Sequence, residues 1–322
     1  MSVNNTGTGL GLKLTDTTRR AFKIGYKDEP VAARSIFDVQ MTDKKTEVFN
    51  SAVMDQFAMP TADGANYGAN SPTLGDELQL TQAKYTASYE VSEDAMQYDQ
   101  YGLFSAFAGG RGLGSITAKT IELYAQQLIS QGASTSYTDH AGNTVSTLCA
   151  DGLALFSSAH TINGSSATYD NLDSTAFGQT GLETLLELFR GFLNHDGQRI
   201  TRRPNTIFST GKASLVNLIT EYNSSVGHPE DAFNGVNVFK ARFNHVVLDY
   251  LDTDSSGVAD SAKDDYWGLV IAKDPNLKLR VSQEPVIHAP QLVQRNRNML
   301  YQASTKFAVG VEDPNCIALS AA

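Results

Sequence analysis

The chain has 322 residues, of which 41% are hydrophobic and 19% are charged, and its formal net charge is −10. This length and apolar content exclude disorder as the default and are enough for one elaborate domain or two modest ones, each with a buried core. The negative charge repels phosphate groups at neutral pH and so disfavours sequence-specific binding of nucleic acid.

The charged fraction is low, because soluble chains average roughly 25% charged residues. Part of the polar surface must therefore consist of uncharged Ser, Thr, Asn and Gln. Such groups cost less to desolvate than Lys or Glu, and a surface of this kind suits burial between neighbouring subunits.

The cysteines and the apolar runs bear on the compartment. Cys149 and Cys316 are the only cysteines and lie far apart in the sequence, which predicts a reducing compartment and no structural disulfide. There is neither an apolar run of roughly 18 residues nor a signal sequence, so we expect no membrane partner.

Residues 1–35 predict an N-terminal arm that packs weakly on its own domain. They begin with Asn, Thr and Gly, continue with mixed charges between Arg19 and Glu29, and reach Pro30. This composition is typical of a terminal segment that ends at a proline.

Two stretches alternate between apolar and polar residues, which is the period of a half-buried strand. They are residues 37–41 and 83–91, and we expect them to pair as the long strands of one hairpin. Leu78 and Leu80 are out of phase with the second stretch, which predicts a β-bulge near Thr81.

The connection between these strands, residues 55–77, is irregular. It has almost no periodicity and contains Pro60, Gly64, Gly68, Pro72 and Gly75. A compact domain rarely tolerates so long an irregular connection unless it is functional or is ordered by a partner. We therefore expect this tip to become ordered by lying across a neighbouring molecule.

Residues 92–131 predict one long helical element with a break. Ser92 and the two acids after it are typical of a helix start. Four glycines between Gly109 and Gly114 should interrupt or kink the helix. The Gly-, Ser- and Thr-rich residues 132–163 then predict a connection.

Shorter helices and strands follow. Residues 180–183 have the pattern of a capping box and predict a helix start, and residues 215–222 predict another helix. Strands are expected at residues 206–210, 236–248, 266–272, 277–281 and 301–311, the last with unbroken alternation. Because helices and strands are mixed without a βαβ repeat, the predicted fold class is α+β.

One segment resembles a metal site. Residues 252–257 match the first half of a calcium-binding EF-hand loop, in which alternate carboxylates and a turning glycine wrap the ion. The twelfth position of such a loop should be a bidentate Glu, and here it is Lys263, a cation that repels calcium. We therefore expect an acidic turn and no metal.

The other candidates for chemistry also favour structural roles. Arg199, Arg202 and Arg203 form a basic cluster that we expect to be solvated or ion-paired. Phosphate-binding and serine-hydrolase motifs are missing. Histidines show no pair at the spacing of a helical metal site; they are His140, His160, His195, His228, His245 and His288. The sequence predicts no catalytic, cofactor-binding or metal-binding residue.

The order of segments resembles the HK97-type capsid fold, with an arm, a long hairpin, a long helix, a Gly/Ser-rich connection, a mixed α/β region and a final long strand. Two segments sharpen the resemblance: DGLALFSSAHT at residues 151–161 and YQASTKFAVGV at residues 301–311. Both are similar to the Mu-like major head subunits of tailed bacteriophages.

This resemblance implies a division of the chain into named parts: an N-terminal arm at 1–35, an extended E-loop hairpin at 36–91, a P-domain spine helix and Gly/Ser-rich connection at 92–164, mainly an A-domain at 165–290, and returning P-domain strands at 291–322. Some members of the family join subunits by a Lys–Asn bond. Lys44, Lys45 and Lys84 flank the hairpin without a motif that identifies a reactive one, so no crosslink is predicted.

The resemblance also implies a function. The chain would be a major capsid protein, not an enzyme, that assembles through pentamers and hexamers into an icosahedral shell around double-stranded phage DNA. It would be assembled in the host cytoplasm, reside in the virion, and have a portal and a separate scaffolding protein as partners. Two alternatives stay open: the shell of an encapsulin-like nanocompartment, and an enzyme whose site is assembled in space from scattered His and Asp residues.

Overall fold

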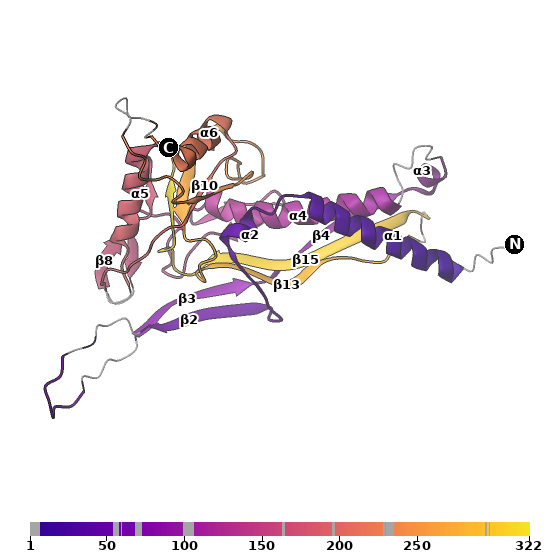
Figure 1. Ribbon diagram of the computed structural model, residues 1–322. Coiled ribbons are helices and arrows are strands. Elements are labelled where there is room, and N and C mark those ends of the chain that lie inside the picture. Colours follow the sequence, from indigo (N-terminus) through magenta and orange to yellow (C-terminus); the bar gives the residue numbers. More distant parts are fainter. Residues whose placement is uncertain are drawn as a thin grey trace.

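The computed structural model describes residues 7–53, 58, 60–67, 73–98, 106–162, 165–194, 197–227, 229, 235–293, 295 and 297–322. Helices and strands are mixed in these residues, which confirms the α+β class. An elongated layer of long strands and two long helices occupies one side of the molecule, and a second sheet with shorter helices occupies the other (Figure 1).

The elongated layer is built on β15 (Met299–Val311), the central strand of a five-stranded sheet. β4 (Ala83–Val91) pairs antiparallel with β15 along its whole length, and β13 (Leu277–Ile287) pairs antiparallel on the other side. β1 (Asp38–Met41) and β14 (Gln291–Leu292) complete the sheet. The strand predicted at residues 301–311 is thereby confirmed.

The predicted pairing of residues 37–41 with residues 83–91 is wrong. β1 pairs in parallel with β13, and β4 pairs with β15. The hairpin consists instead of β2 (Thr46–Val53) and β3 (Thr73–Thr81). Alternation identifies a strand and its buried side, but it does not identify the partner strand.

The change of phase near Thr81 is not a β-bulge. β3 ends there, and the chain passes at Gln82 from the β2–β3 ribbon into the five-stranded sheet. The N–H of Gln82 donates to the carbonyl oxygen of Lys45, 2.8 Å away. A strand that changes sheets also changes which of its sides is buried, and this accounts for the shift between Leu80 and Ala83.

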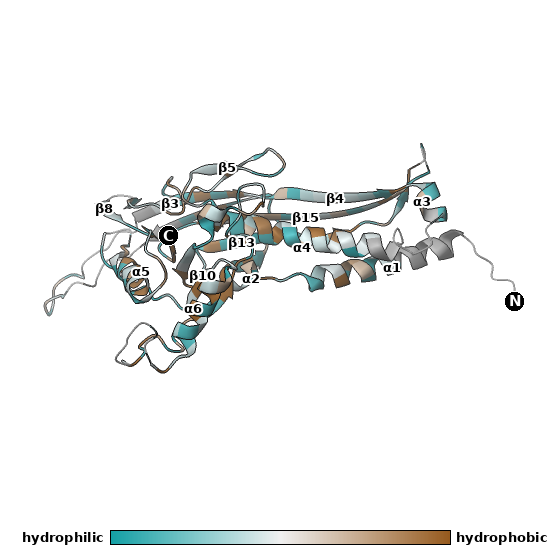
Figure 2. Cartoon of the chain, turned by 90° about the horizontal axis from the view of Figure 1, so that it is seen from above, coloured by the Kyte–Doolittle hydropathy of each residue, from teal (hydrophilic) through white to brown (hydrophobic). Residues whose placement is uncertain are grey.

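Two long helices lie side by side over this sheet, α4 (Ala106–Ser130) and α1 (Gly7–Asp28) (Figure 1; Figure 2). They run in the same direction, since Thr18 meets Gly110 and Phe22 meets Gly114. Thr18, Ala21 and Phe22 are buried. The prediction of a weakly packed arm is therefore wrong for the described residues of 1–35.

Glycines allow this close approach. A Cβ at Gly114 would stand 2.2 Å from the carbonyl oxygen of Phe22, and a Cβ at Gly25 would stand 2.0 Å from that of Arg111. α4 continues through Gly109 to Gly114 without the predicted interruption, because the loss of helix propensity at glycine is offset by packing against a second backbone.

The helix start predicted at Ser92 is confirmed. α3 (Glu93–Gln97) begins there, and Ser92 Oγ accepts the N–H of Ala95. The element predicted over residues 92–131 therefore contains two separate helices, and residues 99–105 between them lie outside the described ranges.

The second sheet has the order β11 (Asn244–Val247), β10 (Thr206–Ser209), β12 (Trp267–Val270), β16 (Ile317–Ser320) and β9 (Leu172–Asp173). α5 (Gln179–Gly191) and α6 (Ala213–Ser224) contribute buried side chains to the same core as Trp267. The remaining elements are α2 (Ala33–Ile36), β5 (Ser136–Thr138), β6 (Thr144–Ser146), β7 (His160–Ile162), β8 (Ser165–Tyr169) and the 3-10 helix η1 (Ser261–Lys263).

Two boundary predictions in this half differ from the structure. The capping box at residues 180–183 does not form, because α5 already begins after Gly178 and the hydroxyl oxygen of Tyr222 accepts the N–H of Gln179. Of the strand predicted at residues 236–248, only β11 forms, and Val236 is 80% exposed.

One core joins the two sheets. Phe307 of β15 and Leu128 of α4 belong to the same buried cluster as Phe208 of β10 and Leu319 of β16. The five-stranded sheet is therefore a rigid base from which the β2–β3 hairpin extends.

Candidate functional site: the projecting hairpin and an aromatic groove

The β2–β3 hairpin is fixed to the sheet by the hairpin root, a cluster made of Asp38, Glu47, Phe49, Lys278 and Arg280. Arg280 Nη1 lies 3.3 Å from Asp38 Oδ2, and Arg280 Nε lies 3.7 Å from Glu47 Oε2. Lys278 Nζ lies 2.8 Å from Glu312 Oε2, outside the hairpin, and 4.1 Å from the centroid of the Phe49 ring. Only 6% of each cationic side chain is exposed. Charges this far from water depend on their partners, so the root holds the hairpin in one orientation.

Apolar contacts reinforce the root, whereas the far end of the hairpin is exposed. Leu78 and Leu80 are buried against Ala308, and a Cβ at Gly310 would stand 2.5 Å from Leu80 Cδ2. β2 and β3 then run away from the body (Figure 1), and Tyr67 is 93% exposed. An exposed aromatic residue beyond the strands of a projecting hairpin is a candidate contact with another chain.

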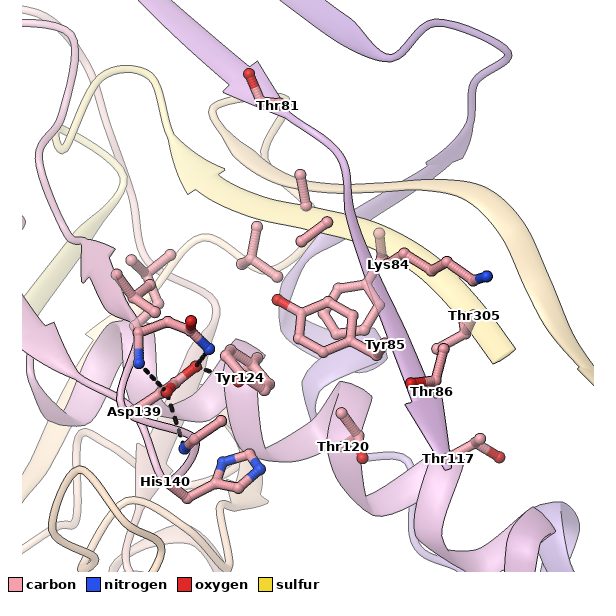
Figure 3. Close-up of a pocket in the computed structure, with 18 of the residues that line it drawn as sticks. Thr81, Lys84, Tyr85, Thr86, Thr117, Thr120, Tyr124, Asp139, His140 and Thr305 are labelled. Atoms are coloured by element: carbon pink, nitrogen blue, oxygen red, sulfur yellow. Dashed lines mark hydrogen bonds between the residues drawn. The ribbon is translucent and has the colours of Figure 1, made fainter. Parts of the chain in front are cut away.

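A groove of about 710 Å³ lies between β4, α4 and the β5–β6 hairpin (Figure 3). Its floor is aromatic, with the ring centroids of Tyr85 and Phe307 4.3 Å apart and those of Tyr85 and Tyr124 4.6 Å apart. Burial raises the pKa of Tyr85 to about 12. Burial also raises the pKa values of Tyr124 and Tyr137, so these phenols stay protonated near neutral pH.

Asp139 supports one wall of the groove. Its Oδ2 accepts the Tyr124 hydroxyl at 2.6 Å, and its Oδ1 accepts the N–H groups of Ala141 and Asn143 at 2.9 and 2.7 Å. Burial acts to raise the pKa of Asp139, but these hydrogen bonds outweigh it and lower the pKa. The carboxylate therefore tethers the β5–β6 turn to α4.

β4 presents an open edge beside this groove. It pairs with β15 along one edge, and no strand in the described part of the chain pairs along the other. Residues 83–87 all line the groove, which places the open edge there. Unpaired N–H and C=O groups of an edge strand can pair with another chain, so the edge and the groove form a second candidate contact surface.

The acidic segment at residues 252–257 forms a turn. Asp254 Oδ1 accepts the N–H groups of Ser256 and Val258, and Lys263 Nζ donates to the carbonyl oxygen of Thr253, 3.0 Å away. Within the described ranges, no group of three or more His, Cys, Asp or Glu residues could hold a metal ion.

The histidines that the structure describes contact structural partners. His160 lies between Asp151 and Asn171, and His288 Nε2 lies 3.0 Å from Ser304 Oγ. His245 Nε2 lies 2.9 Å from Ser209 Oγ, and burial lowers its pKa. His140 lies at the rim of the aromatic groove (Figure 3). His195 and His228 lie outside the described residues.

Arg202 of the basic cluster and the two cysteines also have structural surroundings. Arg202 Nη1 lies 2.6 Å from Asp274 Oδ2, which confirms ion pairing for this member of the cluster. Cys149 and Cys316 are free and buried. Burial raises the pKa of both thiols, so they stay protonated.

The sequence reasoning missed the hairpin root. A signal for it exists, because Lys278 and Arg280 alternate with Leu277, Leu279 and Val281 in the first half of β13. Two cations on one side of a buried strand require anionic or aromatic partners on that side.

Comparisons with known proteins identify the fold. No family model matches the chain, and no curated protein matches it. The capsid of the cyanophage P-SCSP1u has a TM-score of 0.54 at 13% identity, with 88% of this chain and 85% of that chain covered. The mature capsid of bacteriophage PhiM1 has a TM-score of 0.54 at 10% identity, with 91% and 87% covered.

The capsid of a native GTA particle is similar as well, with a TM-score of 0.52 at 12% identity and with 91% of this chain and 90% of that chain covered. The chain therefore has the HK97-type capsid fold, as the order of its segments predicts. The narrower resemblance to the Mu-like head subunits stays a prediction. Among the described helices, none is long and apolar enough to cross a membrane.

Proposed function

We propose that this chain is the major capsid protein of a tailed bacteriophage, a structural subunit without an active site. Copies of it assemble into an icosahedral shell that encloses double-stranded DNA. The observation that carries the proposal is a capsid fold whose hairpin is rooted by buried charges and exposed at its far end. Strands that are fixed at the root present the tip to another chain in one orientation, which limits the conformational entropy lost by the strands on binding.

The parts of the fold take their roles from this proposal. Residues 36–91 act as the E-loop, whose tip lies across a neighbouring subunit. Residues 92–164 and 291–322 form the P-domain, and residues 165–290 form mainly the A-domain. Residues 1–35 serve as the arm, of which α1 is held on α4.

The partners follow from the same role. Subunits associate as pentamers and hexamers, and a portal and a separate scaffolding protein take part in assembly in the host cytoplasm. The finished shell resides in the virion. The charged fraction of only 19% supports extensive burial between copies, because uncharged polar groups are easier to desolvate.

Shortening the hairpin tip tests this function. Replacing residues 54–72 with Asn-Gly keeps both strands and supplies a tight turn. We expect the thermal unfolding of the unassembled subunit to stay the same and the particle yield on a sucrose gradient to fall to background. Tyr67→Ser keeps the tip length and should reduce the yield less. A normal yield from the shortened chain would contradict the proposed role of the tip.

The content of the particles separates the proposal from a nanocompartment. Shells purified from the natural source should contain duplex DNA that is protected from nuclease. Particles that contain only cargo proteins would overturn the genome-enclosing role while leaving the shell-forming role in place.

A further inference from the structure

The exposed side of α1 carries four cations, Arg19, Arg20, Lys23 and Lys27, which we call the basic stripe. Arg19, Lys23 and Lys27 are spaced by four residues, so their side chains lie above one another on one side of the helix. The stripe is at the margin of the molecule, because α1 lies on the far side of α4 from β4 (Figure 2).

The cations have no ion-pair partner among the described residues. The nearby acids Asp28 and Glu29 are used elsewhere, since Asp28 Oδ2 lies 2.7 Å from Arg111 Nη2 and Glu29 Oε1 lies 3.5 Å from Lys119 Nζ. The stripe borders an open groove of about 1200 Å³ between α1 and β13, where the acids Asp16 and Glu284 also lie. Four cations and two carboxylates leave this surface positive.

This local charge is opposite to that of the whole chain. Removing the four positive charges from the net charge of −10 leaves −14 for all other residues. Four unpaired cations at the margin of so acidic a molecule oppose the general repulsion of polyanions. A partner with regularly spaced negative charges fits them best.

We infer that the basic stripe binds the phosphate backbone of duplex DNA and marks the side of the subunit that faces the enclosed genome. One step of four residues along a helix is about 6 Å. Consecutive phosphates of one DNA strand rise about 3.4 Å along the duplex axis and also turn about it, which leaves them about 7 Å apart in space. The stripe can therefore follow a backbone without reading bases, which agrees with enclosure of DNA of any sequence.

The inference rests on the proposed function for its biological setting, but its test uses unassembled subunits. The stripe variant replaces Arg19, Arg20, Lys23 and Lys27 with Gln. The matched control replaces Lys44, Lys45, Lys84 and Lys240, all exposed, with Gln. Both variants carry a net charge of −14, so they differ only in where the charge is lost. Unfolding curves should show that both stay folded, because all eight side chains are exposed and Gln keeps the helix propensity of α1 in the stripe variant.

Fluorescence anisotropy with a short labelled duplex, from about 50 mM salt upward, measures the affinity and its salt dependence. Each phosphate contact steepens the plot of log affinity against log salt by about 0.9. The loss of one contact therefore weakens binding about eightfold at 0.1 M salt. The stripe variant should therefore bind at least about 60-fold more weakly than the control, which corresponds to two lost contacts, and with a shallower slope.

Equal affinities of the two variants would overturn the inference. Competition by polyglutamate as strong as that by DNA of equal charge would also overturn it, because the stripe would then be a site for an acidic protein segment. Electron microscopy of the same preparations tests the shell separately. If the stripe does not bind DNA but the chain still forms particles, this inference is contradicted and the proposed shell-forming function is not.

Discussion

His160 Nδ1 lies 2.7 Å from the carboxylate of Asp151, and the two side chains are only 0% and 6% exposed. On the other side of the ring, His160 Nε2 lies 3.1 Å from Asn171 Oδ1. The amide of Asn171 is oriented, because its Nδ2 donates to the carbonyl oxygens of Leu155 and Ile317. Both ring nitrogens therefore face oxygen atoms, and Asp151 is the buried partner that orients the His160 ring.

Asp151→Asn should destabilise the subunit by about 1 to 3 kcal/mol, the range for a buried hydrogen-bonding group that loses its partner. Asp63→Asn makes the same chemical change at an exposed position and should alter stability by less than about 0.5 kcal/mol. Urea unfolding of both variants at neutral pH measures the difference. Equal midpoints would show that the contact between Asp151 and His160 does not stabilise the fold.

Gly114→Ala should cost about 1 to 3 kcal/mol, because the new methyl group overpacks the α1–α4 contact. Gly112 lies two residues away on the same helix, and a Cβ there would meet nothing within 4 Å. Gly112→Ala should therefore stabilise the chain by about 0.5 to 1 kcal/mol through helix propensity. Opposite shifts of the unfolding temperature are expected, and a loss at both sites would contradict the packing account.

Glu122→Gln should stabilise the folded subunit at neutral pH. Burial raises the pKa of Glu122, its Oε2 accepts the N–H of Ala33 at 2.8 Å, and its Oε1 has no partner among the described residues. A raised pKa in the folded state means that ionisation weakens folding as pH rises above the ordinary value of 4.5.

The advantage of Glu122→Gln over the natural chain should therefore grow as pH rises from that ordinary value and shrink below it. Parallel urea titrations of the two proteins across this range isolate the effect, because every other group is shared. An advantage that does not change with pH would contradict the raised pKa of Glu122 in the folded subunit.

Arg280→Met should cost about 3 to 5 kcal/mol, because it leaves the carboxylates of Asp38 and Glu47 without their cation. It should also speed hydrogen exchange in β2 and β3, which lose their fixed orientation. Arg190 forms an exposed ion pair with Glu187, and Arg190→Met should change stability by no more than about 1 kcal/mol. Unchanged exchange in the hairpin of the Arg280 variant would show that the root does not hold it.

Much of the secondary structure follows from local patterns. Alternation marks β4 and β15 because each has one buried side, and Ser92 marks the start of α3 because its hydroxyl group caps the first turn. The order of these elements is also sufficient to indicate the capsid fold.

The predictions that are wrong fail because of contacts between segments that are far apart in the sequence. Alternation at residues 37–41 and 83–91 could not show that β13 and β15 separate the two strands. The glycines of α4 resemble a helix break in the sequence, and only the backbone of α1 explains them. The hairpin root joins Asp38 to Arg280 across most of the chain, so no local window contains it.

Negative-stain electron microscopy of the purified natural chain, with its scaffolding protein if one is needed, tests the central claim most directly. The account predicts closed, uniform shells with fivefold and sixfold clusters of subunits. A protein that stays monomeric under every assembly condition, with the scaffolding protein present, would contradict it.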